Sequence, residues 1–423
     1  MKKSLLNIIL LLIIKLGYAQ TWSVQTQTNG IQPAYRTSVH FISQNEGWIV
    51  GYTGADAILH TTNGGVNWDP QPLPSTYTYS NSVKSVFFTS PTLGWAVGNG
   101  NTIIKTTNGG ASWTLQPSAS PCSWNKVFFY NSMVGWIGGN SSGTLHGFLR
   151  TTNGGATWIP VTSFTAGVGF PTGSSPSAVD INFISSTKGW LVNQSGSILT
   201  SNDGGVNWTL QYDNHTGIYP KMQTIWFISS NEGWAAGSGT IMKTIDGGNT
   251  WTTLVSGTGS TYPKIQFLDS NTGYLAGDAA GGARISSTND GGITWSANLG
   301  INWGVNDLFM FSPTKGWAVG GDIHTLTSII SVAEHSKNNK DVHLFPNPSD
   351  NEIKINFDLP NIEESLKITF FSIDGKEIKT LEIDKYIETL VINKEDLGVN
   401  NGIFFYKIST PNQIISNGKI IFN

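Results

Sequence analysis

Two short signatures recur along most of this chain, and their repetition restricts the possible folds more than any other feature of the sequence. A glycine followed by an aromatic residue returns every 40 to 54 residues, at Trp48, Trp95, Trp136, Trp190, Trp234, Tyr274 and Trp317. An apolar residue stands seven positions before each of these aromatics: Phe41, Phe88, Phe129, Phe183, Phe227, Phe267 and Met310. Such a period is typical of arrays in which each repeat buries its apolar face against the next.

The second signature is a turn that follows six of the seven aromatics. It reads Gly-Gly-x-x-Trp after Asn or Asp, at residues 63–68, 108–113, 153–158, 203–208, 246–251 and 290–295. The Asn or Asp side chain can accept backbone N–H groups, and the paired glycines tolerate positive φ. Together with Trp22, the two signatures contain 13 of the 16 tryptophans. Because Trp is large enough to fill the gap between neighbouring repeats, we expect its role to be structural.

Within one repeat the local pattern is that of short strands. Residues 85–90, 94–98, 102–107 and 113–117 are β-rich runs separated by Gly, Asn, Ser and Pro. Four strands at this period make one blade of a propeller. The 49 glycines also disfavour long helices. The sequence therefore predicts an all-β fold with a seven-bladed β-propeller over residues 20–330.

The two ends of this domain complement each other. The seventh repeat runs from Met310 through Trp317 to residues 323–330 and lacks the turn and the last strand. Residues 21–26 (TWSVQT) match the last strands of other repeats, such as residues 208–212 (WTLQY). We therefore expect the N-terminal strand to complete the last blade and close the ring, which leaves no open edge at the seam.

These motifs resemble known repeats. The turn pattern Ser/Thr-x-Asp-x-Gly-x-Thr-Trp resembles the Asp-box of the bacterial neuraminidase repeat, with full matches at residues 244–251 and 288–295. Asn207 replaces Thr in the fourth turn, and the first three turns have Asn in place of Asp. The whole unit over residues 21–330 resembles the photosystem II stability and assembly factor family of seven-bladed propellers. The resemblance implies the fold, since such repeats occur in hydrolases and in non-enzymatic binding proteins alike.

The first residues have the pattern of a secretory signal. Two lysines precede an apolar run over residues 5–14, and residues 17–19 (GYA) place small residues before a cleavage site. We expect residues 1–19 to be removed, so that Gln20 opens the mature chain. The apolar run is shorter than the roughly 20 residues of a membrane-spanning helix, and we expect no transmembrane segment in the mature chain.

Charge density changes near residue 331. Residues 20–330 and residues 331–423 each contain 24 charged side chains, although the second segment is much shorter. Residues 331–341 are polar and predict a linker. Beyond it, residues 344–357, 373–380, 397–408 and 417–423 resemble the type A C-terminal sorting domain of the type IX secretion system of Bacteroidetes.

Alternation of apolar and polar residues in this last segment predicts a small antiparallel β-sandwich over residues 342–423. The resemblance implies that the type IX secretion machinery is a partner. It also implies secretion across the outer membrane, to the medium or to the cell surface. The alternative is an accessory binding sandwich.

Candidate binding residues lie in the loops that enter the blades. The first strand of each blade of a propeller lines the axis, so the residues just before it surround one mouth of the channel. Aromatic faces bind sugars or peptide side chains, and clustered cations favour anionic groups. The alternative is that the aromatics only cap the inner strands and the lysines serve solubility. The predicted binding residues are Tyr35, Arg36, Lys84, Trp124, Lys126, Lys221, Tyr262, Lys264 and Trp303.

An enzymatic alternative rests on two acidic residues. Asp180 and Asp307 stand three positions before the apolar residue of the fourth and seventh repeats, nearly opposite each other in a ring of seven. Two facing carboxylates are what glycoside hydrolysis requires. The competing interpretation is that both are solvated residues of inner strands. Sialidases on this fold use an arginine triad and a tyrosine nucleophile, and no such set stands out here.

Composition limits the remaining classes. A formal net charge of −3 gives no global electrostatic case for nucleic acid. A single cysteine, Cys122, excludes a disulfide framework, and the seven histidines lack metal-ligand spacing, so we expect no metal and no cofactor. We predict a monomeric, non-catalytic binding, adhesion or scaffold module that takes a glycan or protein ligand. The alternative is a secreted two-carboxylate glycoside hydrolase on the same propeller.

Overall fold

In a computed structural model the chain divides into two compact units, one over residues 20–329 and one that contains residues 330–423. The expected signal sequence up to residue 18 and the expected linker, residues 331–341, lie outside the described residues. One short helix, α1 (Lys394–Leu397), accompanies the strands of the described part. The structure describes residues 19–25, 35–52, 57–74, 82–118, 122–140, 147–164, 177–193, 195–213, 222–256, 260–279, 282–298, 304–329, 342–345, 349–357, 365–372, 376–383, 389–410 and 414–422.

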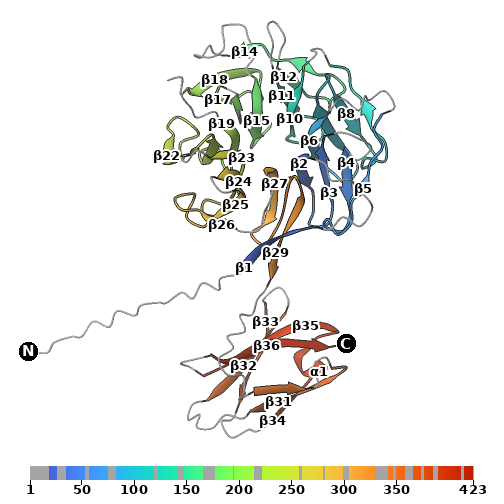
Figure 1. Ribbon diagram of the computed structural model, residues 1–423, viewed down its shortest axis with the longest axis vertical. Coiled ribbons are helices and arrows are strands. Elements are labelled where there is room, and N and C mark those ends of the chain that lie inside the picture. Colours follow the sequence, from blue (N-terminus) through green and yellow to red (C-terminus); the bar gives the residue numbers. More distant parts are fainter. Residues whose placement is uncertain are drawn as a thin grey trace, which may run out of the picture. The chain divides into compact units, whose positions relative to one another are not determined.

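The first unit consists of antiparallel sheets arranged around a common centre, and each sheet runs outward from a central strand (Figure 1). The described residues form seven such sheets. Sheet 1 contains β2 (Arg36–Phe41), β3 (Gly47–Gly51), β4 (Ile58–Thr61) and β5 (Asp69–Pro70). Sheet 2 contains β6 (Val83–Phe88), β7 (Gly94–Gly98), β8 (Ile103–Thr106) and β9 (Thr114–Leu115). Sheet 3 contains β10 (Trp124–Phe129), β11 (Gly135–Gly139), β12 (Phe148–Thr151) and β13 (Ile159–Pro160).

Sheets 4 to 6 follow the same plan. Sheet 4 contains β15 (Ala178–Phe183), β16 (Gly189–Asn193), β17 (Ile198–Ser201) and β18 (Asn207–Tyr212). Sheet 5 contains β19 (Met222–Phe227), β20 (Gly233–Gly237), β21 (Thr240–Thr244) and β22 (Thr252–Val255). Sheet 6 contains β23 (Thr261–Phe267), β24 (Gly273–Ala279), β25 (Gly282–Thr288) and β26 (Ser296–Asn298). Sheet 4 gains a fifth strand, β14 (Ser163–Phe164), which lies parallel to β18.

Sheet 7 is built from both ends of the unit. Its strands are β27 (Val305–Ser312), β28 (Lys315–Gly320), β29 (Ile323–Ile329) and, outermost, β1 (Ala19–Val24). The backbone N–H of Gln25 donates to the carbonyl of Ile323 at 2.9 Å, and Trp22 is buried. Gln25 also reaches sheet 1, where its Oε1 accepts from Trp68 Nε1 at 3.1 Å. Residues 19–25 thus contact both the last sheet and the first.

The recurring Gly-aromatic pair is explained by packing between sheets. A Cβ atom on Gly47 would lie 2.4 Å from the ring of Phe41, so only glycine fits opposite this ring. Trp48 stacks on Phe88 of sheet 2 with 3.5 Å between ring centroids, and its Nε1 donates to the carbonyl of Gly109 at 3.1 Å. The same stack and bond recur at Trp95, Trp136, Trp190, Trp234 and Trp317. These tryptophans join each sheet to the next.

Tyr274 is the exception, and the next repeat supplies the reason. Sheet 7 lacks the Asn/Asp-Gly-Gly-x-x-Trp turn in its sequence, so the glycine carbonyl that the turn supplies elsewhere is not available to an indole. Tyr274 Oη donates instead to the carbonyl of Pro313 at 2.8 Å. Met310 takes the place that phenylalanine holds in the other repeats. The one Gly-Tyr pair of the series therefore precedes the one repeat that lacks the turn.

The stacking and hydrogen bonds of these tryptophans lead to a prediction about stability. We expect Trp234→Phe to lower the free energy of unfolding by about 1–3 kcal/mol, because the buried carbonyl of Gly291 loses its donor. Trp234→Ala should lower it by about 3–5 kcal/mol, since it also leaves a cavity. Urea unfolding followed by tryptophan fluorescence measures both. Val66→Ala, at a site that is 69% exposed, is the control. Unfolding midpoints equal to that of the control would contradict a role of Trp234 in joining the two sheets.

The second unit is a small sandwich of two antiparallel sheets. One contains β30 (Val342–Phe345), β31 (Glu352–Phe357) and β34 (Thr389–Asn393); the other contains β33 (Glu377–Ile383), β32 (Leu366–Phe371), β35 (Gly402–Ser409) and β36 (Ile414–Phe422). Buried residues of both sheets, such as Ile355 and Ile368, form one core. The alternation seen in the sequence places these apolar residues on the inner faces.

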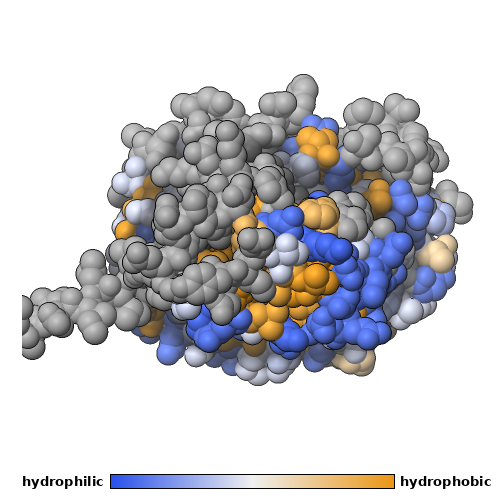
Figure 2. All heavy atoms as spheres, turned by 90° about the horizontal axis from the view of Figure 1, so that it is seen from below, coloured by the Kyte–Doolittle hydropathy of each residue, from blue (hydrophilic) through white to orange (hydrophobic). Residues whose placement is uncertain are grey.

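Some apolar side chains reach the surface. Figure 2 shows an apolar patch beside polar side chains on the face seen from below. Exposed large apolar residues in the second unit include Phe345, Val391 and Ile403. Apolar atoms form a large part of the surface of any folded protein, so these positions alone mark no site.

Candidate functional site

The central strands of the seven sheets carry a polar residue at one repeated position, three residues before the apolar residue of the first signature. The register places it at the same level in each sheet, as in the pairs Ser38 with Val50 and Asp307 with Val319. All of these residues except Lys126 are buried. We call them the central polar set: Ser38, Ser85, Lys126, Asp180, Thr224, Lys264 and Asp307.

Four members of the central polar set accept a backbone N–H of the following sheet. In each bond the donor is the residue that directly follows the set member of the next sheet. Without this acceptor, its backbone N–H would be buried without a partner. The bonds are Val127 N to Ser85 Oγ at 3.2 Å, Ile225 N to Asp180 Oδ2 at 3.1 Å, Ile265 N to Thr224 Oγ1 at 3.2 Å and Val39 N to Asp307 Oδ2 at 3.1 Å. The last of these joins sheet 7 to sheet 1.

The two lysines interrupt this pattern, because an ammonium group has no lone pair to accept an N–H. In both cases the next member of the set is an aspartate. Asp180 Oδ1 accepts the N–H of Ile181 at 3.1 Å, and Asp307 Oδ1 accepts that of Leu308 at 3.0 Å. Each aspartate therefore supplies the acceptor that the preceding lysine lacks, in addition to its charge.

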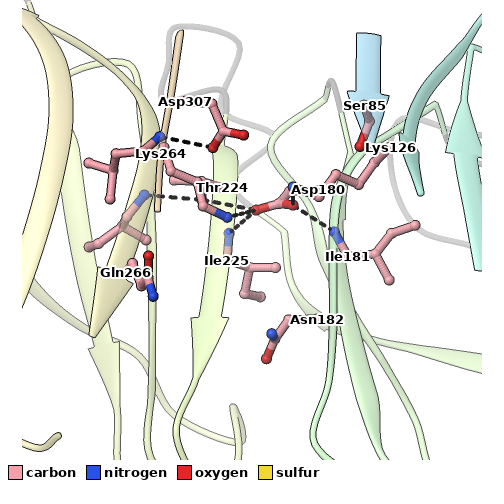
Figure 3. A network of polar contacts seen from close by, with 12 residues as sticks. Ser85, Lys126, Asp180, Ile181, Asn182, Thr224, Ile225, Lys264, Gln266 and Asp307 are labelled. Carbon is pink, nitrogen blue, oxygen red and sulfur yellow. Dashed lines mark hydrogen bonds and ion pairs between the residues drawn. The ribbon is translucent and has the colours of Figure 1, made fainter. Parts of the chain in front are cut away.

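Asp180 lies at the centre of the charged part of the set (Figure 3). Its Oδ1 is 3.1 Å from Lys126 Nζ, its Oδ2 is 3.8 Å from Lys264 Nζ, and Oδ2 also accepts from Thr224 Oγ1 at 2.9 Å. Burial favours the neutral acid, yet the two lysine charges and the hydrogen bonds outweigh it and hold the pKa of Asp180 below its ordinary value. The carboxylate is thus kept ionised.

The two lysines respond differently to the same surroundings. Burial opposes the charge of Lys126, but attraction by Asp180 and Asp307 outweighs it and raises its pKa. For Lys264 burial dominates, and repulsion by Lys126 adds to it, so its pKa is lowered. Lys264 Nζ also lies 5.2 Å from the ring centroid of Trp226. The network holds Lys126 as the firmly charged member.

A second layer lies two residues further along the same strands, at His40, Phe87, Phe128, Asn182, Trp226, Gln266 and Phe309. Its polar members repeat the bond to the next sheet: Phe227 N donates to Asn182 Oδ1 at 3.1 Å and Met310 N to Gln266 Oε1 at 2.8 Å. Burial, with the charges of Lys126 and Lys264, lowers the pKa of His40 to about 3. The imidazole is therefore neutral at physiological pH.

The predicted binding residues are not all at the surface. Lys126 and Lys264 belong to the central polar set. Arg36 and Trp124, at 1% and 0% exposure, are buried, so the expectation that they lie on an exposed rim is wrong. Both begin a central strand just before an irregularity in the pairing with the second strand. A β-bulge of this kind redirects the side chain that precedes it.

Part of the expected rim is exposed at the start of the central strands. Tyr35 is 50% exposed and Tyr52 is 38% exposed, with 5.6 Å between their ring centroids. Tyr35 Oη donates to Asn306 Oδ1 at 2.9 Å, and half-buried Lys84 donates from Nζ to Asn125 Oδ1 at 3.0 Å. We call Tyr35, Tyr52, Lys84, Asn125 and Asn306 the rim. Burial lowers the pKa of Lys84.

The remaining predicted residues add little to the rim. Tyr262 is half-buried within β23. Lys221 and Trp303 lie outside the described residues. Sequence reasoning missed Tyr52, Asn125 and Asn306. The two asparagines occupy the same repeat offset as Lys84, which is a signal that could have found them.

Two further observations bear on chemistry. In the described ranges, no three His, Cys, Asp or Glu side chains are grouped so that they could hold a metal ion. Within the same ranges, no helix has the length and apolar character needed to cross a bilayer. The acidic groups of the centre are instead bound to lysines, hydroxyls and backbone N–H groups.

Solved structures with the same arrangement of sheets are known. A structure of YCF48 bound to D1 peptide covers 73% of this chain and 97% of its own, at 20% identity and a TM-score of 0.57. The WD40 β-propeller domain of Doa1 gives 74% and 98% coverage, 12% identity and 0.54. A streptogramin B lyase gives 73% and 97%, 14% and 0.58. At these identities the likeness shows the fold alone, an all-β fold similar to β-propellers.

Family models match two segments of the chain. Residues 166–300 match the model described as photosynthesis system II assembly factor YCF48, and residues 343–423 match the secretion system C-terminal sorting domain. No curated protein shows significant similarity to this chain. The sorting domain indicates export through the type IX secretion system. The chain therefore contains one segment similar to the photosynthesis system II assembly factor YCF48 family and one similar to the secretion system C-terminal sorting domain.

Proposed function

We propose that this protein is an exported, non-catalytic binding module that holds its ligand at the rim. The observation that carries the proposal is the pair of exposed rings, Tyr35 and Tyr52, of which Tyr35 is bonded to the side chain of Asn306. Aromatic rings of this kind offer a face to sugars or peptide side chains and a hydroxyl to polar groups. The sorting domain supports delivery to the medium or the cell surface through residues 342–423.

We also infer that the seven sheets are blades of one closed ring, completed by β1. Each central strand packs against the next, and β27 packs against β2. The bonds from Val39 to Asp307 and from Trp317 to Gly64 cross the same seam. A closed ring fixes the starts of the central strands, which gives the rim a preorganised geometry.

Lys84 favours a ligand with an anionic group. One of the three N–H bonds of its ammonium group serves Asn125, so two remain for a ligand. The glycan and protein ligands expected from the sequence both fit this chemistry. One similar structure, that of YCF48, is bound to a peptide, and this supports including peptides among the ligands tested.

The two aspartates support a structural role rather than catalysis. Both oxygens of Asp180 and both oxygens of Asp307 accept backbone N–H groups. A two-carboxylate glycosidase needs one acid with a raised pKa, whereas the pKa of Asp180 is lowered. Their bonds therefore favour a binding module over the glycoside hydrolase.

A binding assay with the full mature chain tests the proposal. We expect the double substitution Tyr35→Ala with Tyr52→Ala to weaken binding of at least one member of a panel of anionic polysaccharides and acidic peptides by about tenfold or more. The matched control is Tyr130→Ala, which removes an equally exposed tyrosine beyond the opposite end of a central strand. Unchanged affinity in the stably folded double variant would exclude the rim, and release of sugar from a polysaccharide would overturn the non-catalytic assignment.

A further inference from the structure

Four Asn-Gly dipeptides lie in the described part of the first unit, at Asn63, Asn99, Asn108 and Asn153. This dipeptide is chemically special, because glycine has no side chain to hinder attack by its own backbone nitrogen on the asparagine side chain. Three of the four begin the Gly-Gly turns of sheets 1 to 3, and Asn99 lies in the β7–β8 connection. The same two residues thus occur in two different structural settings.

The reaction is deamidation through a cyclic imide. The glycine nitrogen, once deprotonated, forms a bond to the asparagine Cγ, and the Cγ–Nδ2 bond breaks, so that ammonia leaves. Water then opens the succinimide to aspartate or isoaspartate, and the net change is asparagine plus water to an acid plus ammonia. A glycine N–H that donates a hydrogen bond in the native state is shielded from deprotonation, as it is from hydrogen exchange.

At Asn63, Asn108 and Asn153, the N–H of the following glycine donates a hydrogen bond to a backbone carbonyl. Gly64 N donates to the carbonyl of Asn45 at 2.7 Å, and the equivalent bonds run from Gly109 to Thr92 at 2.9 Å and from Gly154 to Met133 at 2.8 Å. Each asparagine Oδ1 in turn accepts a threonine hydroxyl and a backbone N–H four residues on. Attack at these sites therefore requires the turn to open.

Asn99 stands in a different kind of turn. Gly100 and Asn101 have φ of 63° and 64°, and Thr102 N donates to the carbonyl of Asn99 at 3.2 Å, as in a type I′ turn. Gly100 is exposed, and none of the described residues accepts a hydrogen bond from its N–H. Water and hydroxide can therefore reach the attacking nitrogen without any opening of the fold.

We propose that Asn99 is a site of spontaneous deamidation in the folded protein, whereas Asn63, Asn108 and Asn153 are shielded by their turns. The product places a carboxylate beside Ser82, whose Oγ now accepts from Asn99 Nδ2 at 2.9 Å. The preceding Gly98 pairs with Val83, the neighbour of Lys84, so the new negative charge arises next to the rim. The chemistry itself does not depend on the ligand proposed above.

Peptide mass spectrometry of the full chain tests this proposal. Folded protein and protein in concentrated urea are aged at mildly alkaline pH, and the acid form is quantified at each of the four sites. We expect Asn99 to convert at least about tenfold faster than each turn site in the folded protein. In urea the four rates should agree within about twofold. Equal native rates, or a slower rate at Asn99, would overturn the proposal.

Two variants separate the turn effect from general stability. Asn99→Gln should abolish conversion at this site and leave the other three rates unchanged, because glutamine forms its larger cyclic imide slowly. Thr106→Val removes the hydroxyl that accepts Gly110 N and donates to Asn108, and it should accelerate Asn108 alone by several-fold. If Thr106→Val leaves that rate unchanged, the turn does not provide the protection.

Discussion

Asp180→Asn is expected to lower the free energy of unfolding by about 3–5 kcal/mol, because it leaves buried Lys264 and half-buried Lys126 without their shared counter-ion. Lys126 and Lys264 both lie within ion-pair distance of this carboxylate. Urea unfolding at neutral pH measures the loss. The control is Ser85→Ala, which removes a single acceptor of a backbone N–H and should lower it by about 1–2 kcal/mol. A loss no larger than that of the control would contradict the central role of Asp180.

The same variant has a defined pH dependence. Because the pKa of Asp180 is lowered in the folded state, the unfolded chain binds the proton more readily. The stabilising contribution is therefore fully present above the unfolded pKa of about 4, and it is lost as pH falls through the folded pKa. The difference in stability between the parent and Asp180→Asn should shrink below about pH 4. A difference that stays constant into strong acid would show that the carboxylate charge is not its source.

Deletion of residues 20–25 is the second change with a large expected effect. It removes buried Trp22 and the bond from Gln25 to Trp68, and it exposes the edge of β29. Loss of one buried tryptophan alone amounts to about 3–5 kcal/mol, a large share of the stability of a typical domain. We expect most of the shortened protein to be unfolded or aggregated, which circular dichroism and size-exclusion chromatography would detect.

Two further variants make this deletion informative. Trp22→Ala keeps the strand and should lower the thermal midpoint while leaving the protein soluble. Deletion of residues 342–423, which belong to the other compact unit, should leave the midpoint of the repeat unit nearly unchanged. An N-terminal deletion as stable as the parent would show that β1 contributes little to sheet 7.

The repeat pattern was enough to locate most strands. Residues 85–90, 94–98, 102–107 and 113–117 were expected, and the structure has Val83–Phe88, Gly94–Gly98, Ile103–Thr106 and Thr114–Leu115. The second strand agrees residue for residue, because a Cβ atom at Gly94 would meet the ring of Phe88 and one at Gly98 would meet the backbone of Ser82. The last strand is shorter because Pro117 follows it closely and cannot donate to a ladder.

The site was harder to predict, for a local reason. Trp124 and Lys126 are two residues apart, and regular alternation would place both side chains on one face of the strand. A register shift between them separates the two, so that Trp124 is buried in the core and Lys126 joins the central polar set. The sequence pattern does not indicate that this register shift occurs. The sequence shows that a lysine in one repeat is followed by an aspartate in the next. The structural role of this order depends on backbone N–H groups in the sheet that follows each lysine.

Sheet 7, made from both ends of the repeat unit, imposes an order of events on a newly exported chain. Six sheets consist of segments that are close together in the sequence, whereas the seventh needs a segment from the start of the repeat unit. The contact between Val39 and Asp307 spans 268 residues, and closing so long a loop is an entropic barrier that local contacts do not meet. Until β1 pairs with β29, the outer edge of sheet 7 stays unpaired and can pair with strands of other molecules, which favours aggregation at this stage.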